Sequence, residues 1–259
     1  MAAMVGATSL STSHVVLLLL GGLAAGIFNG VAGGGSLISF PLLLALGYPA
    51  LTANVTNTVG IWPGYVGGAA GFRHQISGQR ERLVRLSPVA VLGGIAGAIL
   101  LLTTSSAAFK SIAPWLVLAA SVLFAAQPLL RRALDGASHT SPHTRPVLLS
   151  GGMFVASVYG GYFGAGMGVM LLAILGLALP DTIARTSGLR TALSILVNGV
   201  AAAVFLIHGG LAWRAVALLA AGSLVGGWIG AKVALSIPAM ALRIVVVAVG
   251  LTTVVKLLV

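Results

Sequence analysis

The sequence contains no cysteine and very few acidic residues. Without cysteine the protein has no disulfide, no thiolate ligand for a metal and no thiol nucleophile. Asp and Glu together number 3 among 259 residues, and only 7% of the chain is charged. A soluble domain carries about 25% charged residues, so this composition excludes an ordinary soluble protein.

The three acidic residues also fall outside the middle of the long apolar runs. Glu81 and Asp135 lie in polar connections, and Asp181 lies at the edge of a run. Proton relays and sodium sites inside membranes usually use buried carboxylates. The sequence therefore argues against an acid-based coupling mechanism, and we expect neither a cofactor nor a metal site.

Basic residues are more numerous than acidic ones. Lys and Arg number 14, which gives a formal net charge of +11, but they are spread along the chain, and the longest basic segment is 73–85. Positive loops are typical of the cytoplasmic flanks of membrane spans. We therefore expect the lipid bilayer, and not nucleic acid, to surround this protein.

Apolar runs dominate what remains. Hydrophobic residues make up 58% of the chain, and runs of about 20 of them, long enough to cross a bilayer, recur along its whole length. The pattern predicts an all-α polytopic membrane protein with about eight transmembrane helices. The expected spans are 14–44, 51–72, 84–104, 111–130, 147–178, 182–207, 211–234 and 238–258.

One extended polar segment, 131–146, predicts a cytoplasmic linker between two four-span repeats, 1–130 and 147–259. If all eight spans cross the membrane, nine Lys and Arg share the side of the N-terminus and four lie opposite. This excess favours both termini in the cytoplasm. A segment that enters the membrane and returns would change the parity, and the repeats could then be inverted instead of parallel.

Glycine is concentrated in two matching segments, 30–47 and 160–176, in the over-long first and fifth spans. Dense glycine weakens a helix, so each span is expected to be broken or re-entrant. Residues 93–98 also match 226–231, which favours an internal duplication over chance similarity. The glycine pairs in these two segments are spaced by four residues and predict close helix packing.

A broken helix could form an anion site. The break frees backbone N–H groups, and the helix that restarts beyond it presents its positive end. Converging amides of this kind bind anions without a charged side chain. The first cluster is Gly33, Gly34, Gly35 and Ser36, and the second is Gly164, Gly166 and Gly168. The alternative interpretation of either cluster is a kink that allows tight packing.

Polar residues near these clusters could complete a substrate site, and Arg190 is the most informative of them. It lies within the sixth span, where a charge is costly and normally faces protein or water. The alternative is that it snorkels to the interface. The other predicted substrate-binding residues are Asn54, Thr56, Asn57, Tyr159, Thr186, Ser187 and Asn198.

Arginine, hydroxyls, amides and glycine backbone without an acid suit a small anion. Because the cell interior is negative, a pathway for anions with no coupling ion would export them, driven by the membrane potential or the anion gradient. We see no P-loop pattern for ATP. Two alternatives remain: a transporter or channel for another solute, or an intramembrane hydrolase. The hydrolase would need a base beside Ser36, and no histidine is expected at mid-membrane depth.

The chain resembles the sulfite exporter TauE/SafE family of membrane permeases over roughly residues 17–258. The motifs that carry the resemblance are 32–35 with Pro41, 46–49, 53–57, 159–168 and 205–211. It implies export of sulfite, sulfonates or related small organic anions across a bacterial inner membrane. One departure leaves the substrate open: the family often has Asn-Ala-Leu-Lys in the sixth span, where this chain has Ser-Gly-Leu-Arg at 187–190. The oligomeric state is not predicted.

Overall fold

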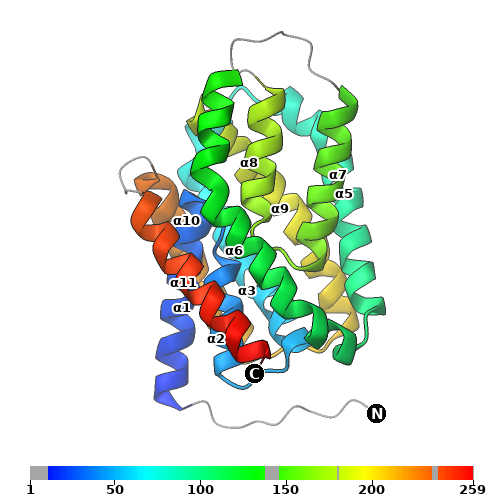
Figure 1. Ribbon diagram of the computed structural model, residues 1–259, viewed down its shortest axis with the longest axis vertical. Helices are drawn as coiled ribbons and strands as arrows, with labels where there is room; N and C mark the ends of the chain where they lie inside the picture. The colour runs from blue at the N-terminus through cyan, green and yellow to red at the C-terminus, as the bar shows by residue number, and fades with distance from the viewer. Residues whose placement is uncertain (1–10, 138–145, 180, 235–238, 259) are drawn as a thin grey trace.

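The computed structural model describes residues 11–137, 146–179, 181–234 and 239–258, and within these ranges all regular structure is helical (Figure 1). Five of the helices are long and apolar enough to cross a membrane. The helices are α1 (Thr12–Val31), α2 (Ser36–Ala45), α3 (Ala50–Gly71), α4 (Arg73–Ile76), α5 (Arg80–Thr103), α6 (Ser106–Ala137), α7 (Pro146–Tyr162), α8 (Met167–Ala178), α9 (Ile183–His208), α10 (Trp213–Val233) and α11 (Ala239–Leu258).

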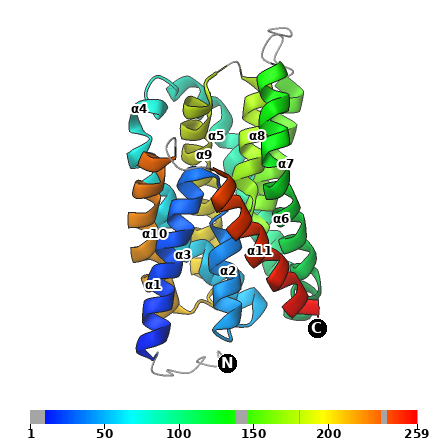
Figure 2. The same ribbon diagram turned by 60° about the vertical axis from the view of Figure 1, so that its left-hand side comes forward.

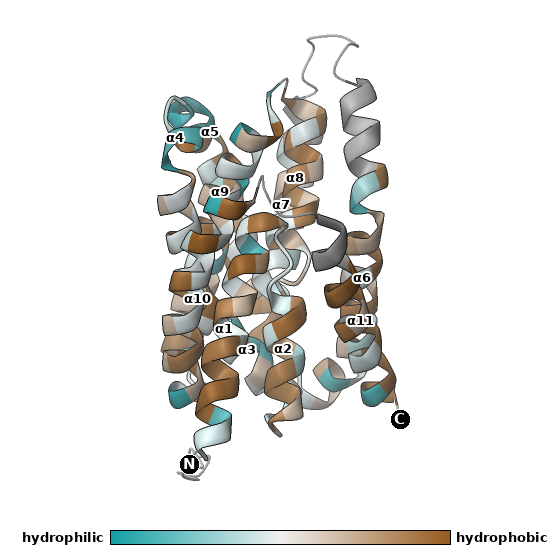
Figure 3. Ribbon diagram, turned by 90° about the vertical axis from the view of Figure 1, so that its left-hand side faces the viewer, coloured by the Kyte–Doolittle hydropathy of each residue, from teal (hydrophilic) through white to brown (hydrophobic). Residues whose placement is uncertain are grey.

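The first over-long span is a helical hairpin made of α1 and α2. A Cβ added to Gly21 would lie 2.2 Å from the side chain of Leu42, and one added to Gly35 would lie 2.1 Å from Ala25 O. The start of α2 therefore lies beside the later part of α1, and the end of α2 lies beside an earlier part of α1. The two helices are antiparallel, as Figure 3 shows, so the segment returns to the side from which it entered.

The fifth span forms a second hairpin, made of α7 and α8. A Cβ on Gly160 would meet the Met167 side chain at 2.1 Å, and one on Gly152 would meet Ile174 at 3.4 Å. In Figure 1, α7 begins at the end of the molecule opposite the start of α1 and the end of α11. The two hairpins therefore enter the bundle from opposite ends.

Glycines allow the long helices to pack at backbone distance. A Cβ on Gly226 would lie 2.1 Å from Leu23 O of α1, and one on Gly227 would lie 1.9 Å from Gly64 O of α3. In the same way, a Cβ on Gly97 would lie 2.0 Å from Val158 O of α7. The predicted role of the small-residue segments 93–98 and 226–231 in packing is confirmed. Because α10 packs on α1 and α3 while α5 packs on α7, each half of the chain packs long helices against the other half's hairpin.

Each half contains a hairpin and three further long helices, so the first and fifth spans take the broken, returning form that the sequence left open. The predicted linker, 131–146, overlaps the end of α6 at Ala137 and the start of α7 at Pro146. Residues 138–145 lie outside the described part of the chain. The sequence duplication itself stays a prediction.

Candidate functional site

The first hairpin turns at residues 32–35. Gly33 has φ +82°, in the left-handed region that glycine adopts readily. The amides of Ala32 and Gly33 both donate to Phe28 O, at 2.9 and 3.0 Å. Asn29 O and Gly30 O therefore lose the amide donors that a continuing helix would supply. The Asn29 side chain braces the turn, because its Oδ1 accepts from the Gly35 amide at 2.8 Å.

The second hairpin turns in a similar way at residues 163–166. Gly164 and Gly166 have φ +80° and +82°. The amides of Phe163 and Gly164 both donate to Tyr159 O, at 2.9 and 3.2 Å. The Tyr159 hydroxyl donates to Ala165 O at 2.7 Å, so Tyr159 stabilises the turn itself.

Gly33 of the first turn and Gly168, two residues beyond the second turn, touch each other through their backbones. This contact forms the junction of the two hairpins. A Cβ on Gly33 would lie 2.7 Å from Gly168 Cα, and a Cβ on Gly168 would lie 2.6 Å from Gly33 Cα. Neither position has room for a side chain. The N-termini of α2 and α8, with the positive ends of their dipoles, therefore meet near the middle of the bundle.

Arg190 of α9 lies against this junction. Its side chain is 2% exposed. Nη2 donates to Asn29 O at 3.1 Å and to Gly30 O at 3.2 Å, the two carbonyls that the first turn leaves without amide donors. Nη1 lies 2.4 Å from the position of a Gly33 Cβ and 3.2 Å from that of a Gly168 Cβ. The guanidinium therefore does not snorkel to an interface, and its positive charge lies beside both turns.

Ser36 and Asn198 reach the second turn from α2 and α9. The position of a Gly164 Cβ is 3.6 Å from Asn198 Oδ1 and 4.0 Å from Ser36 Oγ. Both side chains are buried, at 1% and 3% exposure. Six predicted residues are thus brought together: Gly33, Ser36, Gly164, Gly168, Arg190 and Asn198.

Other predicted site residues contact different parts of the bundle. Gly34 and Gly166 face α6, where a Cβ would meet Phe124 at 2.3 Å and Ala120 at 3.3 Å. The Gly35 amide is bonded to Asn29, as described above. Four further predicted residues form hydrogen bonds elsewhere. Asn54 Nδ2 donates to Tyr162 O at 2.9 Å, and Asn57 Oδ1 accepts from Ser39 Oγ. Thr56 Oγ1 accepts from the Ala212 amide at 3.1 Å, and Thr186 Oγ1 donates to Thr182 O at 3.0 Å. Ser187 is buried in α9, where its carbonyl accepts from Thr191 Oγ1 at 2.8 Å.

Sequence reasoning missed Asn29 and Ser194. Asn29 is an isolated polar residue next to the first glycine cluster, and that position in the sequence could have identified it as a candidate site residue. Ser194 is one helical turn from both Arg190 and Asn198, and its hydroxyl donates to Arg190 O at 2.9 Å. Its backbone carbonyl accepts from Asn198 Nδ2 at 3.1 Å.

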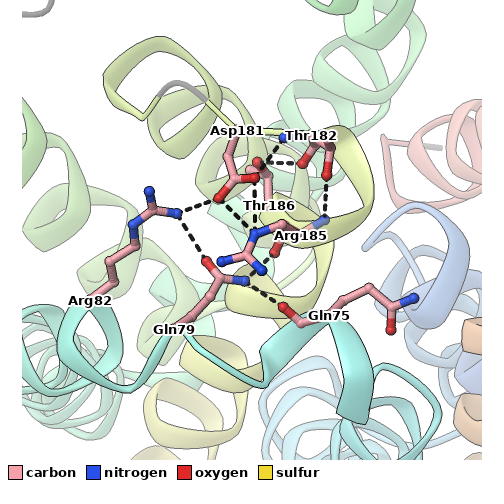
Figure 4. A network of polar contacts seen from close by, with 7 residues as sticks. All are labelled: Gln75, Gln79, Arg82, Asp181, Thr182, Arg185 and Thr186. Carbon is pink, nitrogen blue, oxygen red and sulfur yellow. Dashed lines mark hydrogen bonds and ion pairs between the residues drawn. The ribbon is translucent and has the colours of Figure 1, made fainter.

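A polar network holds the start of α9 against α4 and α5 (Figure 4). The Asp181 carboxylate pairs with Arg82 and, at 3.0 Å, with Arg185 Nε, and Gln79 Nε2 donates to Arg185 O at 2.9 Å. Desolvation raises the pKa of Asp181, but hydrogen bonds from Arg82, Arg185 and the Thr182 amide outweigh it and hold that pKa below its usual value. The network therefore fixes the helix end that lies less than two turns from Arg190.

The junction is electropositive and built largely of backbone. A guanidinium and two helix N-termini supply positive potential there, and glycine allows close approach to the backbone. Among the described residues, no group of three His, Cys, Asp or Glu is placed to hold a metal ion.

A family model described as "Sulfite exporter TauE/SafE" matches residues 18–257 of the chain. A "Probable membrane transporter protein" of Haemophilus influenzae is 29% identical over 235 residues, which are 86% of each chain. "Probable membrane transporter protein ORF9" of a Sinorhizobium species is 25% identical, over 94% of this chain and 92% of its own. "Probable membrane transporter protein YfcA" of Escherichia coli is 23% identical, over 90% and 86%. No solved structure matches the chain significantly.

Proposed function

The chain belongs to the sulfite exporter TauE/SafE family of membrane transporters, and we propose that it exports a small oxyanion through the junction of its two hairpins. Sulfite, sulfonates and related organic anions are the substrate class that the family description suggests. The proposed site of binding lies beside the contact between Gly33 and Gly168, at the Arg190 guanidinium.

The burial of Arg190 carries this proposal. A charged side chain at 2% exposure is costly to desolvate, and in membrane proteins such residues mark substrate or ion pathways. Nη2 is held by α1 carbonyls, while Nη1 lies at the contact between the turns. An anion beside that contact would meet a guanidinium and the N-termini of α2 and α8. The three acidic residues of the sequence lie in the first turn of α5, near the end of α6 and before α9, away from this junction.

Direction follows from the sign of the membrane potential. Moving one negative charge outward across about 100 mV, inside negative, releases about 2.3 kcal/mol, and a dianion releases about twice as much. This energy suffices for export without a coupling ion or ATP.

The decisive experiment is anion efflux from proteoliposomes that contain the purified protein. Vesicles loaded with sulfite, a sulfonate or a carboxylate are given a potential, negative inside, by a potassium gradient with valinomycin. We expect efflux to accelerate with the imposed potential and to slow when the potential is reversed. Efflux no faster than from protein-free vesicles, for all three anion classes, would contradict the proposal.

The hairpins also change the expected orientation in the membrane. Figure 2 shows α4 at one end of the bundle and the start of α1 at the other. From the helix bounds, the basic residues near the α4 end are Arg73, Arg80, Arg82, Arg85, Arg185 and Lys232, and those near the opposite end are Lys110, Arg214 and Lys256. Figure 3 places hydrophilic residues around α4 and the start of α5. The positive-inside rule then places the α4 end in the cytoplasm. Both termini would lie outside, which reverses the expectation based on eight full crossings.

Reporter fusions test this orientation. Alkaline phosphatase is active only outside the cytoplasm, and green fluorescent protein fluoresces only inside. We expect a C-terminal phosphatase fusion to be active and the fluorescent fusion to be dark. Fusions after Gly78, an exposed residue between α4 and α5, should give the opposite pattern. A fluorescent C-terminal fusion would show that the termini are cytoplasmic.

A further inference from the structure

A half-open pocket lies at the end of the bundle that holds the start of α1 and the end of α11 (Figure 2). It has a volume of about 410 Å³ and is formed where α2 ends, where α3 and α6 begin and where α11 ends. Its apolar walls include Leu44, Leu51 and Leu257, and its polar side chains, among the described residues, are Tyr48, Ser106 and Lys110. A mostly apolar pocket of this volume with a few polar groups is typical of a site for a small organic molecule.

Lys110 makes this pocket attractive to an anion. Its side chain is exposed, and no described carboxylate lies at this end of the bundle to neutralise it. The acidic residues whose side chains the structure describes are Glu81, in the first turn of α5, and Asp181, which pairs with Arg82 at the opposite end. A cleft that carries charge of one sign raises the local concentration of the opposite ion. The lysine therefore favours an anionic ligand, and the walls favour one with an apolar part.

Three buried phenylalanine rings lead from this pocket to the second hairpin turn. Phe109 directly precedes Lys110 in α6, Phe40 lies one helical turn before Leu44 in α2, and Phe163 belongs to the turn itself. The centroid of the Phe163 ring lies 5.2 Å from that of Phe40 and 6.5 Å from that of Phe109. Each of the three side chains is at most 1% exposed. The rings therefore pack together between the pocket side of α2 and α6 and the turn.

We propose that the pocket at Lys110 is a vestibule of the transport pathway, and that the three rings close it off from the junction at Arg190. An organic anion in the vestibule places its acid group at Lys110 and its apolar part against the leucine walls. Movement of the rings connects the vestibule with the junction. The preferred substrates are then sulfonates or similar anions with a short alkyl chain, ahead of inorganic sulfite. This inference rests on the proposed anion transport.

Cysteine labelling tests the vestibule, because the chain has no cysteine of its own. Ala107→Cys places one thiol in the pocket, and Ser13→Cys places one at an exposed position in α1 that does not line it. The probe is sulfonatoethyl methanethiosulfonate, supplied on both faces of proteoliposomes, and ethanesulfonate flux is measured before and after labelling. We expect labelling to remove most of the flux through Ala107→Cys and none of the flux through Ser13→Cys.

Protection from labelling measures how the vestibule binds anions. Propanesulfonate should slow the labelling of Ala107→Cys at about a tenfold lower concentration than methanesulfonate, because it buries two more apolar carbons. Adding Lys110→Gln should raise both protecting concentrations by up to about fivefold, the effect of one exposed charge pair. Beyond the rings, Ser36→Cys should be labelled faster when Phe109→Ala removes one ring, in protein whose folding is checked by size-exclusion chromatography.

Each outcome has a distinct meaning. Equal protection by the two sulfonates, or labelling of Ala107→Cys without loss of flux, would overturn the vestibule and leave anion transport standing. Labelling of Ser36→Cys at the same rate with and without Phe109→Ala would overturn its closure by the rings. Absence of flux through the unlabelled wild type for every anion would mean that the proposed function itself fails.

Discussion

Replacing Arg190 with methionine is expected to lower anion flux at least about a hundredfold. Loss of one oxyanion-hole donor in an enzyme typically costs about 100- to 1000-fold in rate, and Arg190 would supply both a charge and donors to the bound anion. Methionine keeps the length and apolar volume of the side chain but removes the charge and the donors at Nη1 and Nη2. The measurement is flux per inserted protein in proteoliposomes, with insertion and folding checked by size-exclusion chromatography.

Arg190→Lys is the matched control for charge. Lysine retains a positive charge but lacks the planar fork that reaches Asn29 O, Gly30 O and the turn contact together. We expect it to transport more than Arg190→Met and less than the wild type. Wild-type flux through folded Arg190→Met would remove Arg190 from the site.

Gly33→Ala should also abolish transport, because it separates the two turns. The added Cβ would lie 2.4 Å from Arg190 Nη1 and 2.7 Å from Gly168 Cα, and φ is +82°. Gly47→Ala is a control with the same strain, since Gly47 has φ +86° and no atom within 4 Å of its Cβ position. Each variant carries a strain of about 1 kcal/mol, but only Gly33→Ala carries the clash.

A second pair of variants avoids backbone strain, because neither glycine has a positive φ. Gly168 and Gly151 are both helical, and a Cβ meets Gly33 Cα at 2.6 Å in the first case and nothing within 4 Å in the second. We expect Gly168→Ala to lose flux and Gly151→Ala to retain it. Equal flux through these two variants would show that close contact of the turns is not needed.

The sequence alone predicted the apolar helices and the places where two of them stop. The glycine clusters lie where α1 and α7 end, because φ values such as +82° at Gly33 and Gly166 are accessible mainly to glycine. The return of α2 along α1 could not be read from the sequence. It depends on contacts such as that of the Leu42 side chain with the backbone at Gly21, which no sequence periodicity indicates.

The sequence indicates the residues at a helix break more readily than it indicates which residues along a helix face that break. Arg190 was identified by the cost of a charge inside a span, but its carbonyl partners in α1 depend on the tertiary fold. Thr56 and Thr186 are near the site in sequence, yet they bond to Ala212 and Thr182. At 100° per residue, neighbours in a helix face different directions, so proximity in the sequence does not establish that these two residues share a face with Arg190.

A crystal structure of the protein with selenate would test anion binding at the paired turns most directly. An anomalous difference map at the selenium edge locates the anion independently of any side-chain interpretation. We predict a strong peak in hydrogen-bonding contact with the Arg190 guanidinium and the backbone of Gly168. A map with strong selenium peaks elsewhere in the protein and none at this junction would contradict the account.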